Sequence, residues 1–419
     1  MKLEALRAAC VIIEGNGVRV LCDPWLDDTA YYGAWAHYPP YEWKEPLKYD
    51  YIYISHIHPD HMSPTTMRKL AKKPVLIHKF KAKFLRKKIE ELGFEVIELD
   101  HAEAMDLGGL KIRIFAADDC DPEACMKFFG CTHADVAATQ IDSMAIFDDG
   151  KEVYANVNDC PYLLSKGMLG RVRKVYPKID VALVAYAGAG PYPQCFNMSN
   201  EEKLVRAEAK MWTFMQHVNL FAAELGALQV FPFAGDYLLQ GRLAGLNKYR
   251  GIPHIAVVHR TLEEMGHSIF QKDVTDYPDP FEQECYINDV LAHRKLDYEH
   301  EKPVAWDTLV TMMMEARKRV SSRAKEIGLS TKTVVYVDSG AGGLFRIRFD
   351  GNPVVDVTDR IYDEKYIRMT VDSRLLQWLL MGPKFAHWNN CEIGSHIMFD
   401  RKPDKFERGI SQVMSYFHV

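Results

Sequence analysis

Four side chains that can bind a metal ion lie within one six-residue segment of this sequence. Residues 56–61 read His-Ile-His-Pro-Asp-His and directly follow the apolar run YIYIS. Because neighbouring residues alternate in direction at a strand end, His56 and His58 can face one cation, while Asp60 and His61 turn toward a second position. Imidazole and carboxylate ligands together suit zinc, iron or manganese. The segment therefore predicts a metal site at a strand end, with space for two divalent transition metals.

The surrounding sequence has the pattern of a frame that could hold this site. Short β-rich runs alternate with longer helical stretches over the first ~260 residues. We expect strands at 9–14, 18–22, 51–55, 74–78, 94–99, 110–116, 143–147, 152–157, 180–186 and 228–233. We expect helices at 63–72, 80–92 and 200–225. This alternation, with hairpins mixed in, predicts an α/β domain with its sheets inside and its helices outside.

A second unit is expected after a polar connection. It would contain a helix at 306–327, strands at 333–338, 344–350 and 353–358, and a segment at 366–380 that begins as a strand and ends as a helix. We therefore divide the chain into a catalytic α/β domain (1–265), a connecting segment (266–303) and a smaller C-terminal α+β domain (304–419). Aromatic residues near the end of the chain predict that this unit packs on the first one (Trp388, Phe399, Phe406, Phe417).

Composition narrows the class of protein. Lys and Arg number 52 against 57 Asp and Glu, a net charge of −5, so nucleic acid is not expected as a partner. No run of about 18 apolar residues is present, so no membrane partner is expected, and the first residues do not read as a signal peptide. Nine scattered cysteines without a C-x-x-C pair argue against a disulfide framework. The expected location is the cytoplasm.

The H-x-H-x-D-H segment resembles the signature of the metallo-β-lactamase fold superfamily. The strand pair that ends in Asp23-Pro24-Trp25 resembles the first hairpin of that fold. The resemblance implies an αββα sandwich with a dinuclear site, a third histidine ligand further along the chain, and a bridging aspartate at a later strand end. His133 and Asp159 match these two positions. Asp118 and Asp119 remain alternatives to His133.

The sequence departs from the superfamily pattern at the last ligand. The family places a histidine after the strand that here reads FPFAGD, and Ala234 stands at that place. Asp236 is the nearest residue that could bind a metal, and His254 and His259 are alternatives. The second cation position is therefore less completely specified than the first.

A narrower resemblance connects the chain to the CMP-N-acetylneuraminate hydroxylase family. It rests on residues 158–160, 180–196, 231–238 and 393–409. Residues 304–385 further resemble a sterol-carrier-like module. The hydroxylase family also carries a Rieske iron–sulfur domain, which needs a C-x-H and a C-x-x-H pair. One C-x-H is present at 131–133, but no C-x-x-H occurs in the sequence.

Two enzymatic hypotheses follow. The first is a metal-dependent hydrolase that acts on a small, anionic or sugar-nucleotide-like substrate through a metal-activated water, with Asp60 and Asp159 as catalytic carboxylates. The second is a di-iron oxygenase that uses the same site and takes its electrons from a separate redox partner protein. A non-catalytic binding protein of the same fold is a third possibility. Zinc would favour the first hypothesis, and iron the second.

Overall fold

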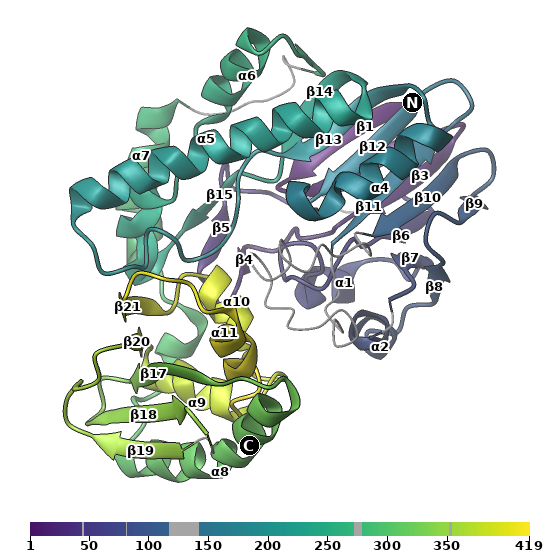
Figure 1. Ribbon diagram of the computed structural model, residues 1–419. Helices are drawn as coiled ribbons and strands as arrows, with labels where there is room; N and C mark the ends of the chain where they lie inside the picture. Colours follow the sequence, from purple (N-terminus) through teal and green to yellow (C-terminus); the bar gives the residue numbers. More distant parts are fainter. Residues whose placement is uncertain (44–45, 81, 117–141, 272–278, 352–353) are drawn as a thin grey trace.

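Two β-sheets face each other between helices, and a smaller domain packs at one end of this sandwich (Figure 1). The computed structural model describes residues 1–43, 46–80, 82–116, 142–271, 279–351 and 354–419. His133, Asp118 and Asp119 therefore lie outside the described residues.

The first sheet is built from the N-terminal part of the chain. Its strands, in spatial order, are β1 (Lys2–Arg7), β2 (Cys10–Gly15), β3 (Val18–Cys22), β6 (Tyr51–Tyr53), β7 (Val75–His78) and β8 (Val96–Leu99). The hairpin between β2 and β3 turns at Asn16 and Gly17, which both have positive φ angles. From β3 to β8 the strands are parallel, so their carboxyl ends lie at one edge of the sheet. The predicted metal-binding segment follows β6 at that edge.

The second sheet comes from the following part of the chain. Its strands, in spatial order, are β16 (Ser268–Ile269), β14 (Ala227–Phe233), β13 (Ile179–Ala185), β12 (Val153–Asn158), β11 (Ser143–Asp148), β10 (Lys111–Ala116) and β9 (Ala104–Asp106). Because β11 and β12 are antiparallel, the beginning of β11 lies beside the end of β12. Residues that precede β11 and follow β12 are therefore brought to the same edge.

Three apolar layers hold this part together. One lies between the sheets and joins residues such as Val20 and Tyr53 to Ile112 and Leu183. Another lies between the first sheet and the two helices α1 (Pro64–Lys69) and α2 (Phe84–Glu91). The third covers the second sheet with α4 (Tyr162–Val175), α5 (Asn200–Leu225) and α6 (Ile255–Glu264). The arrangement is an αββα sandwich, as the sequence predicts.

The C-terminal domain pairs a five-stranded sheet with helices. The sheet runs in the order β19 (Val354–Thr358), β18 (Leu344–Phe349), β17 (Thr331–Asp338), β20 (Tyr366–Thr370) and β21 (Met398–Lys402). The helices are α8 (Trp306–Glu326), α9 (Ser373–Met381), α10 (Trp388–Ile393) and α11 (Arg408–Met414). The order of helix, sheet and closing helix agrees with the expected α+β composition, whereas the sterol-carrier likeness stays a prediction.

The two parts share one continuous apolar cluster. Trp35 and Tyr237, from a small sheet of β4 (Thr29–Ala30), β5 (Trp35–His37) and β15 (Tyr237–Leu239), belong to the same cluster as the C-terminal core. Phe196 stacks on Phe399 at 5.0 Å, and the Phe399 amide donates to the Cys195 carbonyl at 2.8 Å. Trp388 and Phe417 are also buried, but Phe406 is 50% exposed. The C-terminal domain is thus docked on the sandwich.

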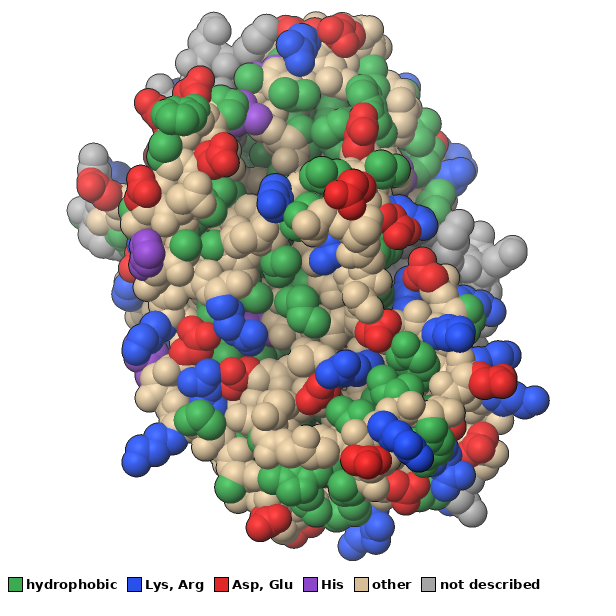
Figure 2. All heavy atoms as spheres, turned by 90° about the vertical axis from the view of Figure 1, so that its left-hand side faces the viewer, with side chains coloured by type: hydrophobic (Ala, Val, Ile, Leu, Met, Phe, Trp, Pro, Cys, Tyr) green, Lys and Arg blue, Asp and Glu red, His purple; other side chains and the backbone are tan. Residues whose placement is uncertain are grey.

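Some elements differ from the expectations. Helix α4 was not expected, and the stretch between the two domains contains a helix, α7 (Pro280–Asp289), with short 3-10 turns after it. The exact domain boundaries stay a prediction. No helix in the described part of the chain is both long and apolar enough to span a bilayer. Figure 2 shows acidic and basic side chains interspersed over one face of the molecule.

Candidate metal centre

Asp23 fixes the start of the metal-binding segment. This fully buried carboxylate accepts hydrogen bonds from the Ser55 amide at 2.8 Å and from the Ser55 hydroxyl at 2.9 Å. The amides of His61 and Met62 then donate to the His58 carbonyl, which folds the segment into a turn. This local bonding pattern directs the side chains of the segment into one buried space.

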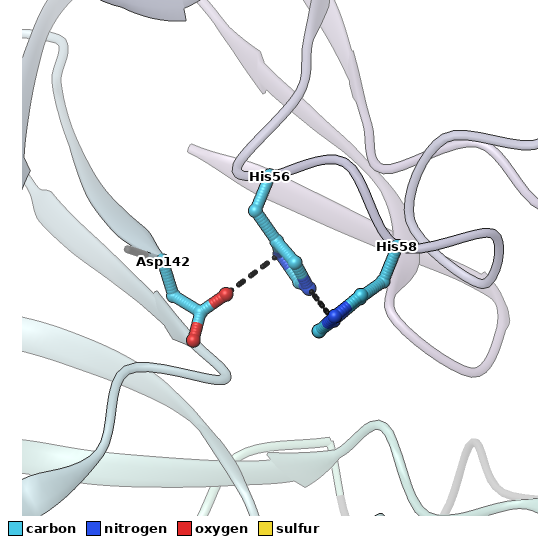
Figure 3. A group of neighbouring side chains, drawn as sticks. All are labelled: His56, His58 and Asp142. Atoms are coloured by element: carbon cyan, nitrogen blue, oxygen red, sulfur yellow. Dashed lines mark hydrogen bonds and ion pairs between the residues drawn. The ribbon is translucent and has the colours of Figure 1, made fainter. Parts of the chain in front are cut away.

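His56, His58 and Asp142 form the first group of metal-capable atoms (Figure 3). The Nδ1 atom of His56 lies 3.1 Å from Oδ1 of Asp142, and its Nε2 atom lies 2.8 Å from Nδ1 of His58. One ligand atom from each residue lies within 4.8 Å of the others. Asp142 immediately precedes β11, so the second sheet contributes this carboxylate to a group that otherwise comes from the first sheet.

His56, His61 and Asp159 form the second group. Nε2 of His61 is 3.4 Å from Oδ2 of Asp60 and 3.4 Å from Oδ2 of Asp159. Asp159 directly follows β12, where Asn158 adopts a positive φ of 54° and turns the chain. Asparagine tolerates this backbone conformation better than most residues. The two groups share His56 and therefore form one cluster.

Carboxylates dominate the electrostatics of this cluster. Burial alone would lower the pKa of His61, but the charges of Asp60, Asp159 and Asp23 outweigh burial and raise that pKa well above its usual value. Burial opposes ionisation of Asp60 too, yet the charge of His61 holds the pKa of this carboxyl below its ordinary value. The carboxylates around His61 thus favour a positive charge at this position.

Burial is the main influence on the pKa values of the remaining groups. Burial, followed by the charge of Asp159, raises the pKa of Asp142 well above normal. Burial, followed by the charges of His61 and His58, lowers the pKa of His56 well below normal, and burial also lowers the pKa of His58. Neutral imidazoles beside crowded carboxylates are the form in which these groups bind divalent cations. The donor set fits one or two transition metals.

Two residues from other parts of the chain support the ligands. The Tyr31 hydroxyl donates to Oδ1 of Asp60 at 2.5 Å. The Oδ1 atom of Asn389, from α10, lies 3.2 Å from Nε2 of His58. A hydrogen bond to this nitrogen leaves Nδ1 of His58 to face His56. Such outer contacts fix the tautomer and orientation of metal-binding histidines.

The structure brings together five of the residues that the sequence analysis selected: His56, His58, Asp60, His61 and Asp159. His133 lies outside the described residues and stays a prediction. Asp236 belongs to neither group, and the strongest influences on its carboxyl are burial, the Ala8 amide and the charge of Arg7. Its role as a ligand also stays a prediction.

Two further histidines that were alternatives have other surroundings. His254 accepts from the Ala256 amide at 3.2 Å and caps α6, and His259 is a buried residue of the same helix. Asp142 is a candidate that the sequence analysis missed. Its position just before a predicted strand, which pairs with the strand before Asp159, was the signal that could have revealed it. Asp23, Tyr31 and Asn389 were missed as supporting residues.

The fold and the site together define a class of protein. Residues 2–127 match the family model described as a β-lactamase superfamily domain. The matched region contains the whole first sheet and the H-x-H-x-D-H segment. The chain thus combines a metallo-β-lactamase fold with an additional C-terminal domain.

Particular relatives are similar over parts of the chain. A Mycolicibacterium smegmatis protein with "Rieske 2Fe-2S iron-sulfur protein" in its name is 27% identical over 264 residues, which cover 60% of this chain and 47% of that protein. The chain therefore spans less than half the length of this relative. The cytidine monophosphate-N-acetylneuraminic acid hydroxylase of Pan troglodytes is 40% identical over 74 residues, which cover 17% of this chain and 12% of the hydroxylase.

One similar solved structure is CmlA, a diiron β-hydroxylase from Streptomyces venezuelae. It aligns with a TM-score of 0.42 at 17% identity, and the alignment covers 64% of this chain and 52% of CmlA.

Proposed function

We propose that this chain is a metal-dependent hydrolase with a dinuclear His/Asp centre. The observation that supports the proposal most directly is the pair of His/Asp groups that share His56 in one buried cluster. His56, His58 and Asp142 would hold one divalent cation. Asp60, His61 and Asp159 would hold a second. When bound, such cations lower the pKa of a water molecule and stabilise the negative charge that develops on a substrate oxygen.

The protein groups have separate tasks in this proposal. Asp60 and Asp159 would act as the catalytic carboxylates: both lie 3.4 Å from His61, and they would orient a metal-activated water. Tyr31 holds Asp60 in position through its hydroxyl. Asn389 holds the His58 ring in position from the C-terminal domain. Both supporting residues restrict rotation of the ligands, which favours a fixed reacting geometry.

The proposed substrate is a small molecule with an anionic group. Asn389 places the C-terminal domain against the metal centre, which favours a small substrate over a polymer. The resemblance to a sugar-nucleotide enzyme supports the anionic character. We infer a cytoplasmic location from the scattered cysteines.

Oxygenation is the second candidate, and two observations favour it. Two imidazoles and one carboxylate, as in the group of His56, His58 and Asp142, are also the ligand set of non-haem iron oxygenases. In addition, the names of the relatives include a Rieske protein and a hydroxylase. Because the sequence has no C-x-x-H pair, the reducing electrons would come from a separate redox partner protein.

One preparation distinguishes the two reactions. The full chain, purified without chelators, is analysed for zinc, iron and manganese. It is then assayed for hydrolysis of bis(p-nitrophenyl) phosphate and p-nitrophenyl acetate. Bound zinc with metal-dependent hydrolysis supports the hydrolase. Bound iron, oxygen consumption in the presence of a reductant, and no hydrolysis would overturn the hydrolase in favour of the oxygenase.

A further inference from the structure

A cavity of about 440 Å³ lies beside the small sheet, away from the two His/Asp groups. Residues of β15, of the 3-10 segment Gly241–Tyr249, of the start of α6 and of one side of α7 line it. Helix α7 lies at the left of Figure 1, the side that faces the viewer in Figure 2. Neither of the two His/Asp groups contributes a residue to the lining. The cavity is thus separate from the candidate metal centre.

Arg250 is the most unusual residue of this lining. Its side chain is only 3% exposed, and its Nη1 atom donates to the Tyr237 carbonyl and to Oδ1 of Asn247, both at 2.8 Å. Within the described ranges, Nη2 has no hydrogen-bond partner and no carboxylate pairs with this guanidinium. A buried guanidinium without an anion is costly, because neither water nor an acid compensates its charge.

Other groups around Arg250 add hydrogen-bonding capacity and, at Lys248, positive charge. Lys248 also lines the cavity and is exposed. Lys210 lies close by, and burial, followed by the charge of Arg250, lowers the pKa of Lys210 to about 7. Tyr186 and Tyr237 line the cavity, and the guanidinium stands 4.0 Å from the Tyr237 ring centre. The surroundings of Arg250 are therefore cationic and aromatic.

Two acidic residues also reach the lining, but neither pairs with Arg250. Burial raises the pKa of Asp236, and its carboxyl interacts with the Ala8 amide and with Arg7. Glu284 is exposed in the middle of α7. In the described part of the chain, neither acid pairs with the Arg250 guanidinium, so this buried charge lines the cavity without a carboxylate partner.

We propose that this cavity binds the anionic group of a small molecule, a carboxylate or a phosphate, beside the guanidinium of Arg250. A guanidinium is a charged hydrogen-bond donor for both groups. The cavity also adjoins the metal centre through an aromatic layer. Tyr237 stacks on Trp35 at 3.4 Å, and Trp35 lies 4.3 Å from Tyr31, which binds Asp60. The proposal does not depend on which reaction the metal centre performs.

Titration calorimetry with simple anions tests the proposal on the full chain. Inorganic phosphate and acetate are titrated separately at constant ionic strength, once with EDTA and once with zinc. The EDTA arm removes anion binding that depends on a metal. We expect binding in the EDTA arm, and the stronger of the two anions identifies the chemistry of the natural ligand.

Three variants locate the binding. Arg250→Gln should weaken binding roughly tenfold or more, since a charge-assisted hydrogen bond is lost. Gly245→Leu should weaken anion binding to a similar extent, because the new side chain would occupy part of the cavity. Gly245 lines the cavity, and a Cβ built there meets no atom within 4 Å, so the backbone accepts a larger residue. Arg323→Gln, which removes a buried arginine of α8, is the matched control and should bind normally.

The outcomes are decisive even if one variant fails to fold. Circular dichroism identifies a misfolded Arg250→Gln, and Gly245→Leu then decides alone. Weakened binding in the folded cavity variants with an unchanged control supports the proposal. Absence of binding in the EDTA arm, or equal binding by the wild type and the cavity variants, overturns it. Metal content and hydrolysis are measured separately, so this result does not bear on the proposed reaction.

Discussion

His58 and Asn389 lie 331 positions apart in the sequence, yet their side chains meet at 3.2 Å. The histidine belongs to the metal-binding segment after β6, and the asparagine to α10 of the C-terminal domain. The same domain reaches the neighbouring loop, where the His387 amide donates to the Tyr32 hydroxyl at 2.8 Å and His396 contacts the Tyr31 carbonyl at 2.7 Å. The C-terminal domain is therefore part of the frame that orients the candidate metal ligands.

Removal of Asn389 should weaken metal binding without unfolding the chain. The Asn389→Ala variant loses the acceptor that orients His58, and loss of such an outer contact lowers metal affinity about 10- to 100-fold. Competition with a chromophoric chelator measures the affinity. Asn389→Asp keeps an oxygen acceptor at this position and should retain most of the metal affinity of the wild type. Equal affinity in the alanine variant and the wild type would show that His58 needs no support from α10.

His58→Ala should remove most of the bound metal while the fold is retained. The reason is that His58 belongs to the first group and is near the protein surface rather than in a sheet core. Elemental analysis and circular dichroism check both statements. His293→Ala, which changes an exposed histidine outside both groups, is the control. An unchanged metal content in the His58 variant would refute the assignment of the first group.

The three aspartates of the cluster should differ in their effects. Asp142→Asn should lose the metal of the first group, and Asp60→Asn should lose only the second. Asp159→Asn should lose at least one metal and the activity, because the amide keeps its size but no longer offsets the cationic charge. Metal-to-protein ratios of the three variants test this order. Two metals retained in Asp159→Asn would mean that another residue links the two positions.

Glu392 makes the stability of the C-terminal domain depend on pH. Burial raises the pKa of this carboxyl from 4.5 to about 7, although Ser411 donates to it at 3.2 Å. The folded state thus prefers the neutral acid, and this contribution to stability is complete below pH 4.5 and is lost as the pH rises through 7. Glu392→Gln cannot ionise. It should match the wild type at pH 4.5 and be more stable at pH 8 by roughly 1–3 kcal/mol.

Thermal unfolding at both pH values measures this difference. Glu364→Gln, at an exposed position of the same domain, serves as the control. Its effect on stability should be the same at pH 4.5 and at pH 8. A Glu392→Gln variant that gains no stability between pH 4.5 and pH 8 would show that this carboxyl is already ionised or solvated in the folded protein.

The sequence predicted the parts of the site that are local, and missed those that need the tertiary fold. His56, His58, Asp60 and His61 lie within one six-residue segment, so their types and spacing predicted a metal site by themselves. Asp142 is a single carboxylate before a strand, and only the pairing of β11 with β12 brings it next to His56. The alternation of strands and helices predicted an α/β domain, and the resemblance to the metallo-β-lactamase superfamily implied the αββα sandwich.

Long-range support could not be predicted in the same way. Nothing in the residues near Asn389 indicates a metal site, because its role depends on how the C-terminal domain docks. Tyr31 likewise carried no signal, since a tyrosine in a loop is compatible with ordinary packing. Arg250 was not selected either, because only the buried position without a carboxylate partner distinguishes it from other arginines.

The measurement that tests the central claim most directly is metal-edge anomalous diffraction from crystals of the full chain, purified without chelators. We predict an anomalous peak within bonding distance of His56, His58 and Asp142, and a second peak beside His61, Asp60 and Asp159. A structure in which these side chains bond only to one another or to water, with no anomalous peak after soaking in zinc or ferrous iron, would contradict the account.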